Sequence, residues 1–252
     1  MKNRILKQKL KNNQLTIGSW ITIGHPAIAE ILSNAGFDWL TLDIEHNSID
    51  NLTVQNIIST IQSKDIAALV RVSKNEEVVI KHVLDAGADG IIVPMINNAE
   101  EAKKAVEFAK YPPIGKRGVG LSRAQNYGFS FNEYRKWVEE FLVVIAQIEH
   151  VDGVKNIKEI ISTKGIDGII IGPYDLSGSL GYPGDYERDD VKEALEKVKQ
   201  ICLNANFPMG YHVVPPDINL LKSSIVEGYR FIAFSTDFYF MGETAKKLMN
   251  SI

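Results

Sequence analysis

Short apolar runs alternate with amphipathic stretches along the whole chain, and this alternation predicts strands followed by helices. The apolar runs are rich in Ile and Val, as in parallel strands that are buried on both faces. Strands are expected at residues 16–21, 39–43, 67–72, 90–94, 143–148, 168–172, 208–211 and 231–234. Helices are expected at residues 26–34, 52–62, 76–85, 99–109, 154–163, 190–204, 217–226 and 238–249.

A short phrase recurs where four of the predicted helices give way to strands. Gly36, Gly87, Gly165 and Gly228 each follow a helical pattern, and each is followed by one residue, then Asp or Arg, then an apolar run. A glycine in this place is typical of the left-handed residue that ends a helix. Eight strand–helix units of about 30 residues fit one closed barrel. We therefore predict a single (β/α)8 TIM barrel domain over residues 1–252.

Composition and charge exclude several classes of protein. The chain is 45% hydrophobic and 23% charged with a net charge of −3, which argues against a general nucleic-acid or anionic-membrane surface. A single cysteine, Cys202, can form neither an intrachain disulfide nor a cysteine metal cluster. The first 15 residues are basic but have no apolar core, and no apolar run approaches a membrane span. We expect a soluble, cytoplasmic protein that acts on small molecules, without nucleic acid or membrane as a partner.

Polar side chains gather where the predicted strands end, and in a barrel these ends meet at one rim. Glu149 and Asp175 follow the fifth and sixth strands, and Gln147 lies beside Glu149. Such oxygen donors suit Mg²⁺ or Mn²⁺. The alternative is that both acids are ordinary loop residues, with Asp175 capping the next turn.

Two further strand ends carry a histidine and an arginine. His46 follows Asp43 and Glu45 and could act as a general base, with Asp85 as the carboxylate that orients it. The alternative is a partly buried histidine that bonds a carbonyl group. Arg71 could bind a substrate carboxylate or a developing oxyanion, or it could form a structural salt bridge to Asp43 or Glu45.

Absent motifs narrow the possible chemistry. The sequence has no dinucleotide-binding or nucleophile-elbow glycine pattern. No lysine lies within or directly after a predicted strand, where a Schiff-base aldolase would need it. Carbon–carbon chemistry in this chain would therefore need a metal as electron sink. The one irregular stretch, residues 111–128, is long and rich in Gly and Pro, which indicates a functional loop.

Several stretches together resemble the metal-dependent (class II) pyruvate aldolases of the HpcH/HpaI family. They are residues 36–39 with 43–46, 84–88 with 93–95, 111–113 with 116–118, 147–149, and 172–177. They occur in the order found in that family and span most of the chain.

The resemblance implies a barrel of the phosphoenolpyruvate/pyruvate-binding type that assembles as a hexamer. It also implies reversible cleavage of a 4-hydroxy-2-oxo acid to pyruvate and an aldehyde, through an enolate that a divalent metal (Mg²⁺, Mn²⁺ or Co²⁺) stabilises. By the same resemblance Glu149 and Asp175 bind the metal, and Arg71 stabilises the developing charge. His46, made more basic by Asp85, moves the proton. The substrate contacts implied are Gln147 and the backbone of Gly172, Pro173, Tyr174 and Asp175.

The sequence departs from the family pattern near the expected substrate. Tyr174 stands where a small or short polar residue is usual, and Asn47 stands where Gly is common. Two other hypotheses therefore stay open. A citrate-synthase-like enzyme could use the same enolate with a CoA thioester whose phosphates contact Lys116, Arg117 and Arg123. A barrel retained only for binding or assembly is the third possibility.

Overall fold

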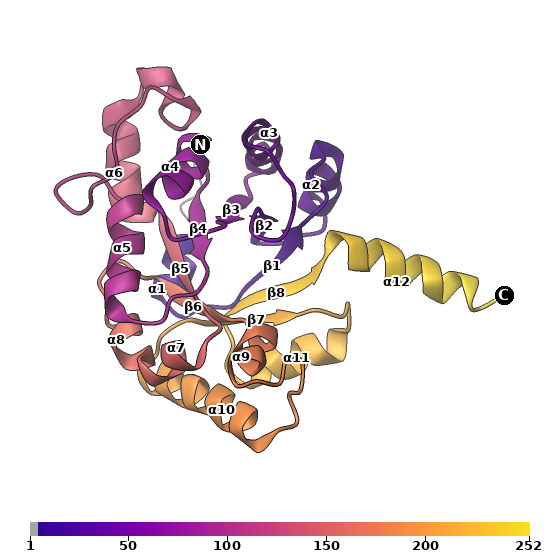
Figure 1. The fold of residues 1–252 in the computed structure, drawn as a ribbon. Coiled ribbons are helices and arrows are strands. Elements are labelled where there is room, and N and C mark those ends of the chain that lie inside the picture. Colours follow the sequence, from indigo (N-terminus) through magenta and orange to yellow (C-terminus); the bar gives the residue numbers. More distant parts are fainter. Residues whose placement is uncertain (1–4) are drawn as a thin grey trace.

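Eight parallel strands close into a barrel in a computed structural model that describes residues 5–252 (Figure 1). Each strand pairs with the next in sequence, and β8 pairs with β1. The strands are β1 (Thr16–Ile21), β2 (Trp39–Asp43), β3 (Ala67–Arg71), β4 (Gly90–Val93), β5 (Val143–Ile148), β6 (Gly168–Ile171), β7 (Met209–Val213) and β8 (Phe231–Thr236). The predicted (β/α)8 barrel is confirmed.

Helices surround the barrel, except that α12 projects away from it and carries the carboxyl terminus outward (Figure 1). The helices before the fifth strand are α1 (Ile5–Lys11), α2 (Pro26–Ser33), α3 (Asn51–Gln62), α4 (Glu77–Asp85), α5 (Ala99–Ala109), η1 (Arg123–Gly128) and α6 (Phe131–Phe141). The later ones are α7 (Val151–Lys155), α8 (Ile157–Ile161), α9 (Pro173–Ser179), α10 (Asp189–Asn204), α11 (Ile218–Val226) and α12 (Asp237–Met249). None of the helices within residues 5–252 is long and apolar enough to cross a membrane.

The structure corrects several predicted boundaries. The helix expected at 154–163 is two helices, because Asn156 ends α7 and donates a side-chain hydrogen bond of 2.8 Å to the Asn97 carbonyl. The strands β7 and β8 each run two residues beyond their predicted ends, to Val213 and Thr236. The residues added include the polar His212, Ser235 and Thr236, and the prediction ended each strand at its last apolar run for that reason. Helices α1, α6 and α9 were not predicted.

The glycines of the recurring phrase adopt the left-handed conformation that was predicted for the ends of helices. Gly36, Gly87, Gly165 and Gly228 have left-handed φ angles of 90°, 109°, 105° and 97°. In three of the phrases the Asp that follows accepts a hydrogen bond from a backbone N–H at the start of the preceding strand. The pairs are Asp38 with Ile17 (2.8 Å), Asp89 with Ala68 (2.9 Å) and Asp167 with Val144 (2.9 Å). The phrase thus ends a helix and fixes adjacent strands at the amino-terminal end of the barrel.

The barrel interior is filled from its amino-terminal end. Trp39 stacks on Phe231 with ring centroids 4.2 Å apart, and Leu6 and Leu10 of α1 join this interior cluster. A second, larger apolar layer lies between the strands and the surrounding helices. Residues 1–4 lie outside the part of the chain that is described, so only 5–15 of the basic leading stretch can be placed. With this end closed, the carboxyl ends of the strands are left for polar groups.

A glycine in β1 tests the packing of the interior. A Cβ added at Gly18 would lie 2.0 Å from Cδ2 of Trp39. We expect Gly18→Ala to lower the free energy of unfolding by roughly 1–3 kcal/mol, as overpacked cores do. Gly118→Ala is the control, because there a Cβ would approach only the Lys81 side chain, no closer than 3.9 Å. Denaturant unfolding of both variants measures the difference, and equal stability would show that the ring can move aside.

Candidate active site

The side chains that point into the barrel are apolar in its interior and polar at the carboxyl ends of the strands. Side chains alternate between the two faces of a strand, so positions two residues apart share a face. Leu69 and Ile145 belong to the interior cluster, and Arg71 and Gln147 are the next inward positions on their strands. The same alternation after Trp39 brings Asp43 into the barrel mouth.

These side chains surround a cavity of about 870 Å³ at the carboxyl end of the barrel. At the barrel mouth it is lined by Trp20, His46, Arg71, Gln147, Gly172, Asp175 and His212. On its outer side it is lined by Tyr174, Tyr186, Tyr211 and Tyr229, among others. A larger cavity of about 1040 Å³ lies at the amino-terminal ends of the strands. The chemistry of closed α/β barrels takes place at the carboxyl end, so the 870 Å³ cavity is the candidate site.

A bidentate ion pair fixes Arg71. Its Nε and Nη2 lie 2.9 and 2.8 Å from the two carboxylate oxygens of Asp43, and its guanidinium carbon lies 4.5 Å from the centroid of a Trp20 ring. Burial alone would raise the pKa of Asp43, but the hydrogen bond and charge of Arg71 hold that pKa below its usual value. The structural salt bridge that the sequence left open is therefore present, and it orients the guanidinium toward the cavity.

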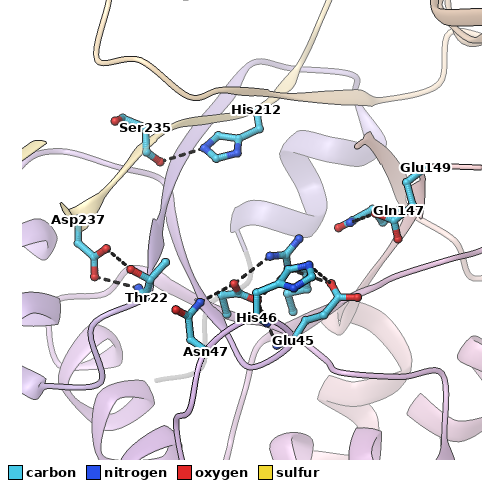
Figure 2. A network of polar contacts seen from close by, with 11 residues as sticks. Thr22, Glu45, His46, Asn47, Gln147, Glu149, His212, Ser235 and Asp237 are labelled. Atoms are coloured by element: carbon cyan, nitrogen blue, oxygen red, sulfur yellow. Dashed lines mark hydrogen bonds and ion pairs between the residues drawn. The ribbon is translucent and has the colours of Figure 1, made fainter. Parts of the chain in front are cut away.

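Asp43 also holds the loop that carries His46, although the sequence did not mark it as a site residue. It accepts hydrogen bonds from the Glu45 backbone at 3.1 Å and from the Asn47 side chain at 2.6 Å (Figure 2). Asn47 thus fixes this loop to Asp43. The inward position of Asp43, two residues beyond another inward residue of its strand, was the signal available in the sequence.

Glu149 is held by one hydrogen bond on each of its carboxylate oxygens. The backbone N–H of Met95 donates to Oε1 at 2.7 Å, and the Gln147 amide donates to Oε2. Met95 is in the left-handed region at φ 54°, a conformation that costs a non-glycine residue about 1 kcal/mol or more. Burial raises the pKa of Glu149; the two hydrogen bonds oppose this shift and the charge of Asp175 adds to it. Sequence reasoning did not identify Met95, which acts through its backbone.

The segment from Gly172 to Asp175 lies against Glu149. A Cβ at Gly172 would be 2.9 Å from both Cβ and Oε2 of Glu149, so only glycine fits. Pro173 begins α9, and Tyr174 is exposed at the cavity rim, where its ring lies over Gly184. Within residues 5–252 the carboxylate of Asp175 makes no hydrogen bond or ion pair, which does not fit the alternative of a capping residue. Asp175 is therefore free to bind a ligand from the cavity.

Glu45 brings a further acid to the site. Its buried Oε2 accepts no hydrogen bond and lies 3.3 Å from Arg71 Nε and 3.8 Å from His46 Nε2. Burial raises its pKa to about 7; Arg71 opposes this shift, and the charges of Glu149, Asp43 and Asp175 add to it. Asp43, Glu45 and Glu149 thus share one guanidinium, and Asp175 adds a fourth negative charge nearby.

A divalent cation fits this excess of negative charge, because carboxylate oxygens are the ligands that hard cations prefer. Within residues 5–252 no three His, Cys, Asp or Glu side chains form a complete ligand set. Glu149 and Asp175 are two carboxylates at this place that could hold such an ion if water and substrate filled its other coordination positions.

The structure does not pair His46 with Asp85, the carboxylate that was expected to orient it. His46 is largely exposed at the cavity rim, and the carboxylate beside it is Glu45 (Figure 2). Asp85 instead pairs with Nη2 of Arg117 at 2.6 Å. Arg117 is 1% exposed and also contacts the Tyr134 hydroxyl at 3.2 Å. Because a buried guanidinium needs a counter-charge, Asp85 serves Arg117 rather than His46 within this chain.

Comparison with known proteins identifies the family. The model of the HpcH/HpaI aldolase/citrate lyase family matches residues 16–241. The chain belongs to this family. A hydroxypyruvate/pyruvate aldolase of Roseobacter denitrificans is 33% identical over 243 residues, which are 96% of this chain and 94% of the relative. A 4-hydroxy-2-oxo-heptane-1,7-dioate aldolase of Escherichia coli is 35% identical over 245 residues, 96% of this chain and 92% of the relative.

A solved structure agrees with this assignment. A Burkholderia cenocepacia protein of the HpcH/HpaI aldolase/citrate lyase family superposes with a TM-score of 0.93 at 30% identity, covering 99% of both chains. The predicted resemblance is confirmed. Both relatives named above are aldolases, which are carbon–carbon lyases, so the predicted enzyme class is confirmed as well.

The basic residues that the CoA hypothesis needs are already engaged in this HpcH/HpaI chain. Lys116 pairs with Glu107 at 2.7 Å, and Arg117 pairs with Asp85. Arg123 donates to the Ala86 carbonyl at 2.9 Å and to the Gln62 side chain at 3.1 Å. None of the three basic residues lines the 870 Å³ cavity. The structure therefore does not favour the CoA hypothesis over the aldolase.

The Asp85–Arg117 pair has a direct test in this HpcH/HpaI protein. Asp85→Asn leaves a buried guanidinium without its counter-charge, and we expect the free energy of unfolding to fall by about 3 kcal/mol. Asp85→Asn combined with Arg117→Met removes both charges and should be more stable than Asp85→Asn alone. Asp152→Asn is the control, because its ion pair with Lys155 is exposed. Denaturant unfolding of Asp85→Asn that matches the wild type would mean that Arg117 does not depend on Asp85.

Proposed function

We propose that this chain is a divalent-metal-dependent aldolase that reversibly cleaves a 4-hydroxy-2-oxo acid to pyruvate and an aldehyde. The observation that carries the proposal is the pairing of buried Glu149 with unpartnered Asp175, close enough to interact electrostatically and beside Arg71. Among residues 5–252 no lysine lines the cavity, so a Schiff base has no amine to form on.

The metal site of the proposal consists of Glu149 and Asp175. These two carboxylates would hold Mg²⁺, Mn²⁺ or Co²⁺, with Gln147 and Met95 keeping Glu149 in place. Such an ion, when bound, acts as a Lewis acid toward a carbonyl oxygen and stabilises negative charge on it. Gln147 and the backbone of residues 172–175 would contact the 2-oxo acid, since they border the same part of the cavity.

Arg71 and His46 supply the charge and the proton transfer. Asp43 and Glu45 engage Nε and Nη2 of Arg71, so Nη1 is left to donate to the oxygen on which negative charge grows as the carbon–carbon bond breaks. His46 stands at the exposed rim, where it can take the proton of the C4 hydroxyl group and return it during condensation. Asp85 is given no part in this proton transfer, because within one chain it pairs with Arg117 in the loop after α5.

Metal removal is the first test of the activity. Chelation should abolish both pyruvate release and exchange of the pyruvate methyl protons with solvent, and Mg²⁺, Mn²⁺ or Co²⁺ should restore them. Glu149→Gln should keep the fold but bind metal at least about tenfold more weakly, because a charged ligand is lost. Asp152→Asn, an exposed acid three residues further on, is the matched control.

Full activity after metal stripping would overturn the metal-dependent mechanism. So would pyruvate trapped on a lysine by borohydride. Isothermal titration calorimetry of Glu149→Gln with Mn²⁺ tests the ligand separately, and an unchanged affinity would overturn the assignment of Glu149.

We propose that the chain, acting as one barrel domain in the cytoplasm, assembles into the hexamer that the resemblance implies. Its partners in the reaction are small molecules, and neither nucleic acid nor a membrane takes part. Helix α12 supports self-association: only Asp237 of this helix is buried, while Phe238, Met241, Leu248 and Met249 are exposed. An exposed apolar helix face of this kind marks an interaction surface, and we assign it to a second copy of the chain.

The assembly is tested by light scattering after size exclusion. The expected mass is six times the 28.1 kDa of one chain. Met241→Glu places a charge on the apolar face of α12 and should shift the mass downward, because an unpaired charge at an interface is costly. Lys247→Glu alters the opposite face of the same helix and should leave the mass unchanged. A monomer at all concentrations would contradict the proposed assembly.

A further inference from the structure

His212 stands in the barrel mouth, and the proposed mechanism does not use it. It follows Gly210 on β7 at the next inward position, so its ring enters the cavity that holds Arg71 and Asp175. The ring lies against Trp20, with ring centroids 5.6 Å apart and planes tilted by 49°. Figure 2 shows it on the far side of the site from Glu45 and His46. The strand predicted at 208–211 ends one residue before His212, so the sequence did not identify His212 as a site residue.

Ser235 determines which nitrogen of His212 carries the proton. His212 Nε2 lies 3.3 Å from the Ser235 carbonyl oxygen, which also accepts a hydrogen bond of 3.1 Å from the Ser19 hydroxyl group. A carbonyl oxygen only accepts, so Nε2 carries the hydrogen and Nδ1 has the free lone pair. Ser235 is left-handed at φ 55°, beside a shift in the β1–β8 register. A strained residue of this kind persists only when its surroundings hold it, and it often marks a functional site.

The lone pair of Nδ1 has no hydrogen-bond partner among the described residues, 5–252. Within residues 5–252 the contacts of His212 are the Ser235 carbonyl and the Trp20 ring, and neither donates to Nδ1. Burial lowers the pKa of His212 to about 4, so the imidazole is neutral at pH 7. A neutral imidazole with so low a pKa is a weak general base but a good hydrogen-bond acceptor. It therefore fits a ligand group that donates a hydrogen bond.

Charge restricts what that ligand can be. Arg71 is the only cationic residue among the described residues that line the cavity, and Asp43 and Glu45 already share it. The lining also includes the acids Asp175 and Glu227. The carboxylate of pyruvate would be neutralised at the metal site, but a second anionic group further out would meet no cation. The outer wall offers instead the rings and hydroxyl groups of Tyr174, Tyr186, Tyr211 and Tyr229.

We propose that His212 is a specificity-determining residue, whose Nδ1 accepts a hydrogen bond from a hydroxyl group next to the carbonyl of the acceptor aldehyde. The preferred acceptors are uncharged hydroxyaldehydes, and aldehydes that carry a carboxylate, sulfonate or phosphate gain nothing from their charge. This inference rests on the proposed aldolase function, because the acceptor is the aldehyde of that reaction.

The test compares two acceptors of nearly equal size in the condensation with pyruvate and Mn²⁺. Glycolaldehyde has a hydroxyl group where propanal has a methyl group. The wild-type ratio of kcat/KM for glycolaldehyde over propanal should fall by about five- to tenfold in His212→Leu, the effect of losing one neutral hydrogen bond. A ratio within one variant is unaffected by losses of folding or metal binding that lower both rates alike.

Two further variants separate the hydrogen bond from packing. His212→Asn keeps an acceptor oxygen close to the place of Nδ1 and should retain most of the preference. Val214 also lines the cavity but has an apolar side chain, so Val214→Ala changes packing without removing a hydrogen bond. This variant should leave the ratio of kcat/KM values unchanged. An unchanged ratio in His212→Leu overturns the role of His212, and so does an equal fall in Val214→Ala.

The charge restriction has its own pair of acceptors. Succinic semialdehyde has a carboxylate where pentanal has an ethyl group, and the wild type should use it no better than pentanal. A marked preference for succinic semialdehyde overturns the restriction. Exchange of the pyruvate methyl protons, measured without aldehyde, tests the underlying aldolase function separately. Exchange without a hydroxyl preference overturns the inference about His212 alone, whereas absence of exchange overturns the proposed function.

Discussion

An excess of carboxylate over positive charge in the barrel mouth is the constraint on which the site depends. Asp43, Glu45 and Glu149 interact with the guanidinium of Arg71, Asp43 engages its Nε and Nη2, and Asp175 adds a further negative charge beside Glu45 and Glu149. Carboxylates that lie close together raise one another's pKa unless a cation balances their charge, and burial adds to this effect. The raised pKa values of Glu45 and Glu149 reflect this imbalance. Binding of a divalent cation would relieve this imbalance and would leave one positive charge to balance an anionic 2-oxo acid, so the site is built to be completed by its ligands.

Closure of the barrel is what brings this charge together. The acids and Arg71 come from β2, β3, the end of β5 and the start of α9, which are far apart in sequence. The glycine–Asp phrase fixes strands at the amino-terminal end, where Asp38, Asp89 and Asp167 bond the backbone of neighbouring strands. That end is packed with apolar side chains and closed by α1. The carboxyl end can therefore carry polar and charged groups that destabilise the protein when no ligand is bound. In barrels of this kind the amino-terminal end serves stability and the carboxyl end serves function.

The sequence predicted the strands that begin with the phrase well, because glycine, Asp and a run of Ile and Val leave little choice of structure. It failed where a polar residue belongs to a strand, as with His212 in β7 and Ser235 in β8. Glu149, Asp175 and Arg71 could be predicted from their places after strands. The pairing of Asp85 with Arg117 could not, because it depends on a loop whose path no local pattern determines. The role of Met95 could not be predicted either, because this residue contributes a backbone N–H and not a side chain.

Two non-glycine residues with left-handed backbones flank the site, and each fixes one functional group. Met95 at φ 54° turns its N–H toward Glu149, and Ser235 at φ 55° turns its carbonyl toward His212. Each conformation costs about 1 kcal/mol or more, and such strained residues often mark functional sites. Met95 orients a proposed metal ligand, whereas Ser235 selects the tautomer of an imidazole that makes no other hydrogen bond among residues 5–252. One strained residue thus lies beside the half of the cavity that would bind pyruvate, and the other lies beside the half that would receive the aldehyde. This arrangement argues that His212 is placed for a ligand rather than for folding.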